Sequence, residues 1–104
     1  MIKVIIERRI APGLEGYYQQ MIGNLLTQIK TAPGYLGGES LEDTNAPNHF
    51  IVIAKWQSID AWENWYHSSD RKRIITEISP LLEQPEHFTI LKQTVMQFQA
   101  LKSA

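Results

Sequence analysis

The chain has 104 residues, of which 43% are hydrophobic and 20% are charged, and this composition is ordinary for one globular domain around a single core. It contains no cysteine, which excludes disulfide bonds, thiolate catalysis and cysteine-ligated metal or iron–sulfur centres. The formal net charge of −1 gives no electrostatic reason to expect a polyanionic partner such as a nucleic acid.

The apolar runs of the chain are short. The isoleucine-rich start is too short for the apolar core of a secretory signal, and no run approaches the length that spans a bilayer. We therefore expect a single domain over residues 1–104 that resides in the cytoplasm, with no membrane contact. Its core should extend to about residue 98, and a frayed C-terminal tail should follow.

The first half of the chain predicts a strand, a helix and two further strands. Residues 2–10 are rich in β-branched side chains and favour a strand, which the Pro12-Gly13 turn ends. Apolar residues then recur with helical spacing over residues 14–29, and Pro33-Gly34 ends this helix. Residues 35–42 and 50–56 then predict two antiparallel strands, and residues 43–48 predict the loop that joins them.

The second half predicts two helices and a last strand. Ser58 suits a helix N-cap, and the helix should run to about His67. A second cap over residues 68–70 begins another helix that ends at Ile78. Residues 88–98 then predict a long final strand. The two adjacent helices count as one helical segment. The order strand–helix–strand–strand–helix–strand then predicts an α+β, ferredoxin-like βαββαβ fold with a four-stranded antiparallel sheet.

The predicted strands carry apolar side chains on both faces, although helices can cover only one face of such a sheet. One set comprises Ile2, Val4, Ile6, Phe50, Val52, Ala54, Trp56, Phe88, Ile90, Met96 and Phe98. The opposite set comprises Ile5, Ile51, Ile53, Leu91 and Val95. Since an exposed apolar sheet face is unfavourable, we expect a homodimer that packs sheet against sheet. The alternative is a monomer whose loops and C-terminal tail cover the second face.

All three tryptophans fall within residues 56–65. Trp62, Trp65 and Tyr66 share one side of the predicted helix with Ala61, which indicates a roomy, aromatic-lined space between this helix and the sheet. A flat aromatic ligand could stack there and accept a hydrogen bond from an indole N–H group. The alternative interpretation is ordinary core packing.

The three histidines show no metal-ligand spacing, so we expect no metal site. His67 follows the aromatic helix and could serve as an acid–base group, because an unperturbed histidine titrates near neutral pH. The alternative is a solvated residue at the end of a helix.

Two adjacent arginines, Arg8 and Arg9, lie on the first predicted strand and must point to opposite faces. Alternation places Arg8 on the face of Ile6, where it could stabilise an anionic or enolate oxygen of a substrate. The alternative is an ion pair with a nearby carboxylate such as that of Glu7, Glu39 or Glu42.

A basic run at residues 71–73 is interpreted as a solvated helix face. The same fold order occurs in RNA-recognition domains, but residues 49–56 lack the aromatic pattern that such domains carry on the third strand. The sequence also has no GxSxG motif, Walker loop or dinucleotide fingerprint. We therefore expect no nucleic-acid partner.

With these features together, the chain resembles the antibiotic biosynthesis monooxygenase (ABM) domain family of the dimeric α+β barrel superfamily. The resemblance covers about residues 1–95 and rests on three features: Ala32-Pro33-Gly34-Tyr35, the block Trp56-x-Ser58-x-x-Ala61-Trp62-x-x-Trp65, and the final strand after His87-Phe88. It implies a ferredoxin-like protomer that dimerises through its sheet. Relatives include cofactor-free monooxygenases of quinols and polyphenols, haem-degrading oxygenases and an isomerase of a phosphorylated signalling sugar.

The resemblance also bears on the site. Trp65 matches a pocket tryptophan of the haem-degrading relatives, whereas Arg8 stands where they have an asparagine and Ile75 stands near their haem-ligating histidine. Degradation of haem by their arrangement is therefore not expected.

The first hypothesis is a monooxygenase that uses O₂, without any cofactor, on a small aromatic or quinol-like substrate. Trp62, Trp65 and Tyr66 would bind the substrate, Arg8 would stabilise an oxyanion, and His67 or a water would accept a proton. The alternatives are a non-catalytic dimer that binds an apolar small molecule and a divergent haem-binding or haem-degrading relative.

Overall fold

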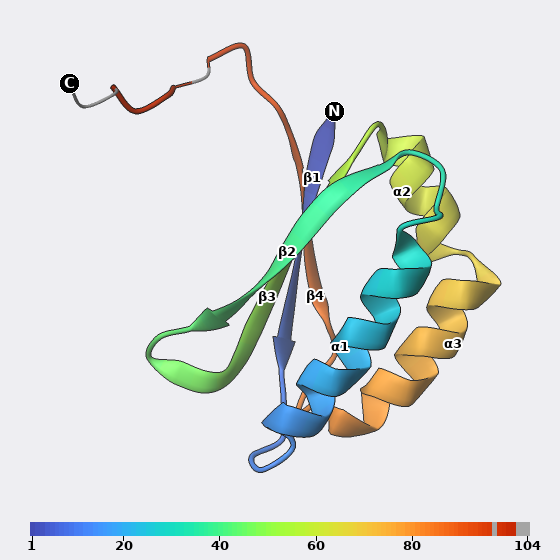
Figure 1. Ribbon diagram of the computed structural model, residues 1–104, viewed down its shortest axis with the longest axis vertical. Coiled ribbons are helices and arrows are strands. Elements are labelled where there is room, and N and C mark those ends of the chain that lie inside the picture. The colour runs from blue at the N-terminus through green and yellow to red at the C-terminus, as the bar shows by residue number, and fades with distance from the viewer. Residues whose placement is uncertain (97, 102–104) are drawn as a thin grey trace.

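The computed structural model describes residues 1–96 and 98–101 and contains the predicted succession of elements (Figure 1). They are β1 (Ile2–Arg9), α1 (Glu15–Ile29), β2 (Tyr35–Asp43), β3 (Ala46–Trp56), α2 (Ile59–Tyr66), α3 (Ser69–Ile78), the 3₁₀ turn η1 (Ser79–Leu81) and β4 (His87–Lys92). The second helical segment is thus a pair of short helices, as the two cap signals at residues 58 and 68–70 indicate.

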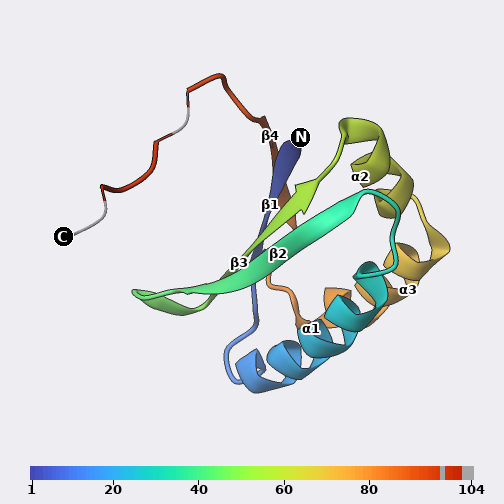
Figure 2. The same cartoon turned by 45° about the horizontal axis from the view of Figure 1, so that its top comes forward.

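The four strands form one antiparallel sheet in the order β2-β3-β1-β4. All three helices lie against the same face of this sheet (Figures 1 and 2). The sheet order and the helical layer confirm the predicted α+β, ferredoxin-like fold. The N-terminus and the end of β4 lie at the same end of the sheet, and the α1–α3 layer follows its long direction.

The core lies between the sheet and the helices. Alternation along the central strands directs Val4, Ala54 and Trp56 toward the helices, where each is 3% exposed or less. Helices α1 and α3 close this layer with Tyr18, Ile22, Leu25, Ile29, Ile74 and Ile78. No helix in the described part of the chain has both the length and the apolar character of a membrane-crossing segment.

The predicted loop over residues 43–48 is wrong, because β3 already begins at Ala46. A tight turn joins the two strands, and Asp43 pairs directly with Ala46. The backbone N–H of Asn45 donates to Asp43 Oδ1 over 2.8 Å, which is the local side-chain bond that stabilises such turns. Pro47 is tolerated because it stands at the beginning of the strand.

The final strand is also shorter than the predicted residues 88–98, since β4 ends at Lys92. Lys92 pairs with Ile2, the first residue of β1, and the ladder between the two strands ends with this pair. The described residues of the tail beyond β4 are largely exposed: Val95, Met96 and Phe98 are 100%, 66% and 83% exposed. Of the tail residues expected to fray, residues 102–104 lie outside the described residues.

Within the described residues, no helix covers the second face of the sheet (Figure 2). The strand register places on it Ile5 opposite Ile53, Leu41 opposite Ile51, and Leu91 opposite Lys3. Leu41 and Leu91 are 43% and 45% exposed, and the three isoleucines are half-buried. This apolar set, called the open face below, agrees with the predicted second face except for Val95, which lies beyond the sheet.

Candidate functional site

The aromatic helix α2 packs on the end of the sheet through its tryptophans. Ser58 caps it as predicted, because Ser58 Oγ accepts the backbone N–H of Ala61 over 3.1 Å. Trp62 and Trp65 are 4% and 7% exposed. Their rings lie 5.9 and 6.4 Å from the ring of the fully buried Trp56, so the three indoles form one cluster.

Gly34 explains why the turn after α1 can press against α2. Its φ of +84° is unfavourable for residues with a side chain, and a Cβ there would lie 2.5 Å from the Cβ of Ala61. The glycine thus permits a close approach as well as a turn. Tyr35 follows it and packs edge-on against Trp56, with 5.3 Å between the ring centroids.

A small cavity lies between this aromatic cluster, α1 and the sheet, with Trp62, Trp65, Arg8 and Arg71 in its lining. Its volume is about 30 Å³, which is enough for one or two water molecules. The expectation of a roomy space is therefore wrong for this structure, because Leu25, Ile29 and the tryptophans fill most of it. A larger molecule could enter only if lining side chains moved.

Arg8 occupies the helix-covered side of the sheet, as alternation predicts, and is only 3% exposed. Its Nε and Nη2 both lie 2.7 Å from Glu86 Oε2, and its Nη1 donates to the Tyr18 hydroxyl over 3.0 Å. Burial disfavours the charged guanidinium, but Tyr18 and Glu86 outweigh that effect and raise the pKa of Arg8. Burial likewise raises the pKa of Tyr18, although Arg8 opposes this, so the phenol is neutral at pH 7. The ion pair given as the alternative for Arg8 exists, and its partner is Glu86 rather than Glu7, Glu39 or Glu42.

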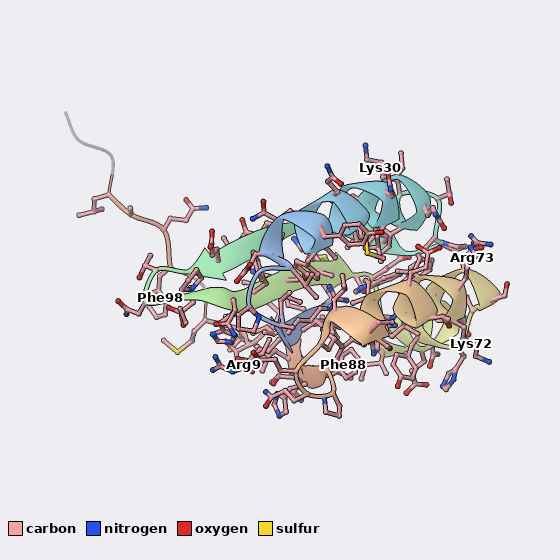
Figure 3. The ribbon with its side chains drawn as sticks, turned by 90° about the horizontal axis from the view of Figure 1, so that it is seen from below. Arg9, Lys30, Lys72, Arg73, Phe88 and Phe98 are labelled. Atoms are coloured by element: carbon pink, nitrogen blue, oxygen red, sulfur yellow. The ribbon has the colours of Figure 1, made fainter. Side chains whose placement is uncertain are left out.

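Arg71 contradicts the interpretation of residues 71–73 as a solvated face. Its side chain is 5% exposed, and its Nη2 donates to Glu86 Oε1 over 2.8 Å. Its guanidinium carbon lies 5.3 Å from the centre of the Tyr66 ring and 5.7 Å from that of Phe88. Lys72 and Arg73 do lie on the outer side of α3 (Figure 3).

Local structure positions both partners of this buried cluster. Ser68 caps α3 by accepting the N–H of Arg71 over 3.2 Å and donates to the Trp65 carbonyl over 2.6 Å, which ties α3 to α2. Glu86 directly precedes β4, and its side chain is 7% exposed. Its two carboxylate oxygens thus each serve one arginine. The group Arg8, Glu86 and Arg71 is called the arginine cluster below.

Tyr66 and His67 lie at the outer edge of the site. Tyr66 is 40% exposed and packs between Trp62 and Phe88. His67 is exposed at the C-terminal end of α2, with its ring edge-on to Tyr66 at 5.1 Å. The structure therefore brings Arg8, Trp62 and Trp65 together at the cavity, with Tyr66 beside them, but leaves His67 outside it.

One buried polar atom of the aromatic cluster lacks a partner. Among residues 1–96 and 98–101, only Trp56 Nε1 is a fully buried side-chain polar atom without a hydrogen bond. An unsatisfied buried donor is unfavourable by about 1–3 kcal/mol. The indole N–H that is both fully buried and without a partner is therefore that of Trp56, on the sheet.

A second polar group lies on the open face. The ring of His49 has Nδ1 3.0 Å from Asp43 Oδ2 and Nε2 3.2 Å from Glu7 Oε1, and His87 Nδ1 lies 3.3 Å from Glu7 Oε2. Because both neighbours of His49 accept hydrogen bonds, only its protonated ring can donate to both. No set of three or more metal-ligating side chains converges within the described residues.

Comparison with known proteins agrees with this geometry. A family model described as antibiotic biosynthesis monooxygenase matches residues 1–77. Comparison with curated proteins finds no match.

Solved structures similar to this one include an antibiotic biosynthesis monooxygenase, with a TM-score of 0.82, 20% identity, and 90% of this chain and 99% of the other covered. A conserved protein of Methanosarcina mazei has a TM-score of 0.83 at 14% identity, and the match covers 89% of this chain and 92% of the other. A mutant of SnoaB, a cofactor-independent oxygenase of Streptomyces nogalater, has a TM-score of 0.79 at 14% identity, and the match covers 92% of this chain and 97% of the other. At these identities the structural likeness shows a common fold.

Proposed function

Because the chain belongs to the antibiotic biosynthesis monooxygenase family, we propose that it oxidises a small aromatic or quinol-like molecule with O₂ and uses no metal or organic cofactor. The proposal draws on one structural neighbour, SnoaB, which is described as a cofactor-independent oxygenase. In such a reaction the substrate has to supply the electrons that an external cofactor would otherwise provide.

The observation that carries the proposal is the position of buried arginine charge beside the tryptophans. Arg8 and Arg71 line the same small cavity as Trp62 and Trp65. A flat ring could stack on the indoles, and a guanidinium in a dry site stabilises negative charge that develops on a substrate oxygen. The resemblance to cofactor-free monooxygenases implies that the species that reacts with O₂ is an electron-rich aromatic anion.

A balanced reaction of this kind converts a phenol to a quinone. The substrate loses its O–H proton and a ring hydrogen, one oxygen atom of O₂ joins the ring, and the other leaves as water. Arg8 would stabilise the phenolate, and Trp62, Trp65 and Tyr66 would hold the ring. Because His67 is exposed outside the cavity, we assign the proton transfer to a water molecule rather than to His67.

Oxygen uptake with a panel of phenols and quinols tests this function. We expect consumption of one O₂ for each quinone formed, and no consumption by the unfolded protein. Stoichiometric binding of an apolar ligand without oxygen uptake would contradict the enzyme and support the non-catalytic alternative. Addition of haemin, followed by its Soret band, tests the haem-binding alternative, for which we expect no shift.

Trp65→Phe tests whether the indole contacts the substrate. Replacement by alanine would remove a buried ring and destabilise the protein by about 3–5 kcal/mol, so phenylalanine is the better variant. We expect a higher KM for a flat substrate and unchanged α-helical circular dichroism. Tyr17→Phe, on the exposed side of α1, is the matched control and should leave KM unchanged. Equal KM values for Trp65→Phe and Tyr17→Phe would show that the indole of Trp65 does not contact the substrate.

We further propose that two copies associate through their open faces. The face is apolar at its centre, and the described tail does not pack on it, since its residues are largely exposed. Lys3 and Lys55 pair at one end of this face, and Glu7 and Asp43 lie toward the other end, together with Arg9 and His49. A two-fold axis perpendicular to the strands would bring unlike ends together.

Light scattering tests the association. The wild-type protein should have twice the chain mass of 12.0 kDa, and Ile53→Glu at the centre of the open face should have the mass of one chain. Tyr17→Glu on α1 places the same charge on the helical side and should remain a dimer. A wild-type monomer at micromolar concentration would refute the proposal.

A further inference from the structure

The arginine cluster contains more positive than negative charge. Arg8, Arg71 and Glu86 are 3%, 5% and 7% exposed in their side chains. Since Tyr18 is neutral at pH 7, two cations face one anion. A buried charge without a partner of opposite sign is strongly unfavourable, so this arrangement favours the binding of one further anion.

Arg71 has the unused hydrogen-bonding capacity that such an anion needs. A guanidinium has five N–H donors, and within the described residues the Arg71 guanidinium makes one hydrogen bond, from Nη2 to Glu86. Arg8, in contrast, uses Nε, Nη1 and Nη2 toward Glu86 and Tyr18. Arg71 is therefore the better donor to a ligand.

The surroundings of Arg71 determine what kind of anion fits. Its guanidinium lies over the rings of Tyr66 and Phe88, and it lines the cavity together with Trp62 and Trp65. A small inorganic anion would leave these apolar walls without a partner. A planar aromatic ring that bears an anionic oxygen, admitted by movement of the side chains that now fill the site, would meet both the walls and the charge.

We propose that Arg71 is a ligand-binding residue that recognises a carboxylate or phenolate oxygen on an aromatic molecule bound beside Trp62 and Trp65. The ligand thus carries its negative charge when it binds, before any reaction. This inference rests on the proposed function only in placing the ligand in the tryptophan-lined cavity, and it concerns binding, not oxygen chemistry.

A matched ligand pair tests the proposal by calorimetry: 4-nitrobenzoate, which is anionic, and 4-nitrobenzamide, which has the same shape and no charge. Because hydrogen bonds to charged groups contribute more than neutral ones, we expect the carboxylate to bind at least about tenfold more tightly than the amide. Quenching of tryptophan fluorescence should accompany binding, since every tryptophan of the chain belongs to this cluster.

Arg71→Met should bring the affinities of the two ligands to within about threefold of each other, with amide binding preserved. This variant leaves Arg8 paired with Glu86, so the fold should persist, and retained amide binding reports that the cavity is intact. Arg71→Lys keeps the charge but loses the planar fork, and it should recover part of the preference. Arg73→Met, two residues along on the exposed side of α3, is the control and should behave as the wild type.

Equal wild-type affinities for the two ligands, a preference that survives in Arg71→Met, or a failure of both ligands to bind would each overturn the proposal. Oxygen uptake tests the enzymatic activity separately. Turnover of neutral phenols without any anion preference would retain the monooxygenase and refute this inference. Anion preference without oxygen uptake would do the opposite.

Discussion

Glu86→Gln removes the only negative charge from the arginine cluster while it keeps the shape of the side chain. Both arginines would then be buried cations without a counter-ion. Glutamine offers one carbonyl oxygen, so it can accept from Arg8 or from Arg71, and its NH₂ group must face the other guanidinium. The variant therefore replaces three contacts between opposite charges, two of 2.7 Å and one of 2.8 Å, by hydrogen bonding of one guanidinium to an uncharged carbonyl and one repulsive contact.

The size of the effect follows from the burial of the three groups. Loss of one partner from a buried ion pair destabilises a protein by about 3–5 kcal/mol. The residual hydrogen bond recovers part of this, so we expect a loss of about 3 kcal/mol in the free energy of unfolding. Because a typical domain is stable by about 5–15 kcal/mol, the variant should still fold.

Urea denaturation at one fixed protein concentration measures the loss, since association would make the midpoint depend on concentration. A loss of about 3 kcal/mol lowers the midpoint by about 1–3 M at an unchanged slope. Arg73→Gln is the control. It breaks the ion pair between Arg73 and Asp70, whose side chains are 60% and 53% exposed, respectively, and it should change the free energy of unfolding by no more than about 1 kcal/mol. A loss below about 1 kcal/mol in Glu86→Gln would refute the buried cluster.

Two further predictions concern the turn before β2 and the end of the open face. Gly34→Ala should destabilise the protein at least about 1 kcal/mol more than Gly13→Ala in the same denaturation assay, because both glycines have positive φ but only Gly34 contacts Ala61; equal losses would refute the close approach. Hydrogen bonds from His49 and from the backbone lower the pKa of Asp43. A lowered carboxyl pKa stabilises the fold above the ordinary carboxyl range and ceases to do so as the pH falls through the folded value. Asp43→Asn should therefore be less stable than the wild type at pH 7, and the difference should shrink below about pH 4; a constant difference across this range would contradict the assignment.

The fold was predictable because its signals are local. Helical spacing, the Ser58 cap and the Pro33-Gly34 break each depend on a few neighbouring residues. The two errors concern where strands pair. The end of β4 is set by where β1 begins, at Ile2, and the start of β3 is set by the pairing of Ala46 with Asp43 on β2. Neither the partner of a strand nor its register can be derived from its own residues.

The candidate site was predictable only in part, for the same reason. Alternation correctly directed Arg8 to the helix side of the sheet. Its partner Glu86 was missed because Glu86 is far from Arg8 in sequence, and because the residues of β4 do not show that β4 lies beside β1. Arg71 left a usable signal. It stands three and seven residues before Ile74 and Ile78, which are both buried, so helical spacing places it on the apolar side of α3. The adjacent Lys72 and Arg73 obscured that pattern.

Stability alone does not account for the arginine cluster. Well-packed apolar side chains of similar volume often stabilise an interior as well as a buried ion pair does, or better, and a cluster with unequal numbers of cations and anions is less favourable still. The excess charge nevertheless lies where the cavity meets Trp62 and Trp65, and the other described arginine of that helix segment, Arg73, is exposed. A ligand anion explains both the excess and its position, because the charge that is unfavourable in the empty protein becomes the source of affinity in the complex. The open face requires no such ligand, since its lysines and carboxylates can be matched by a second copy of the same face.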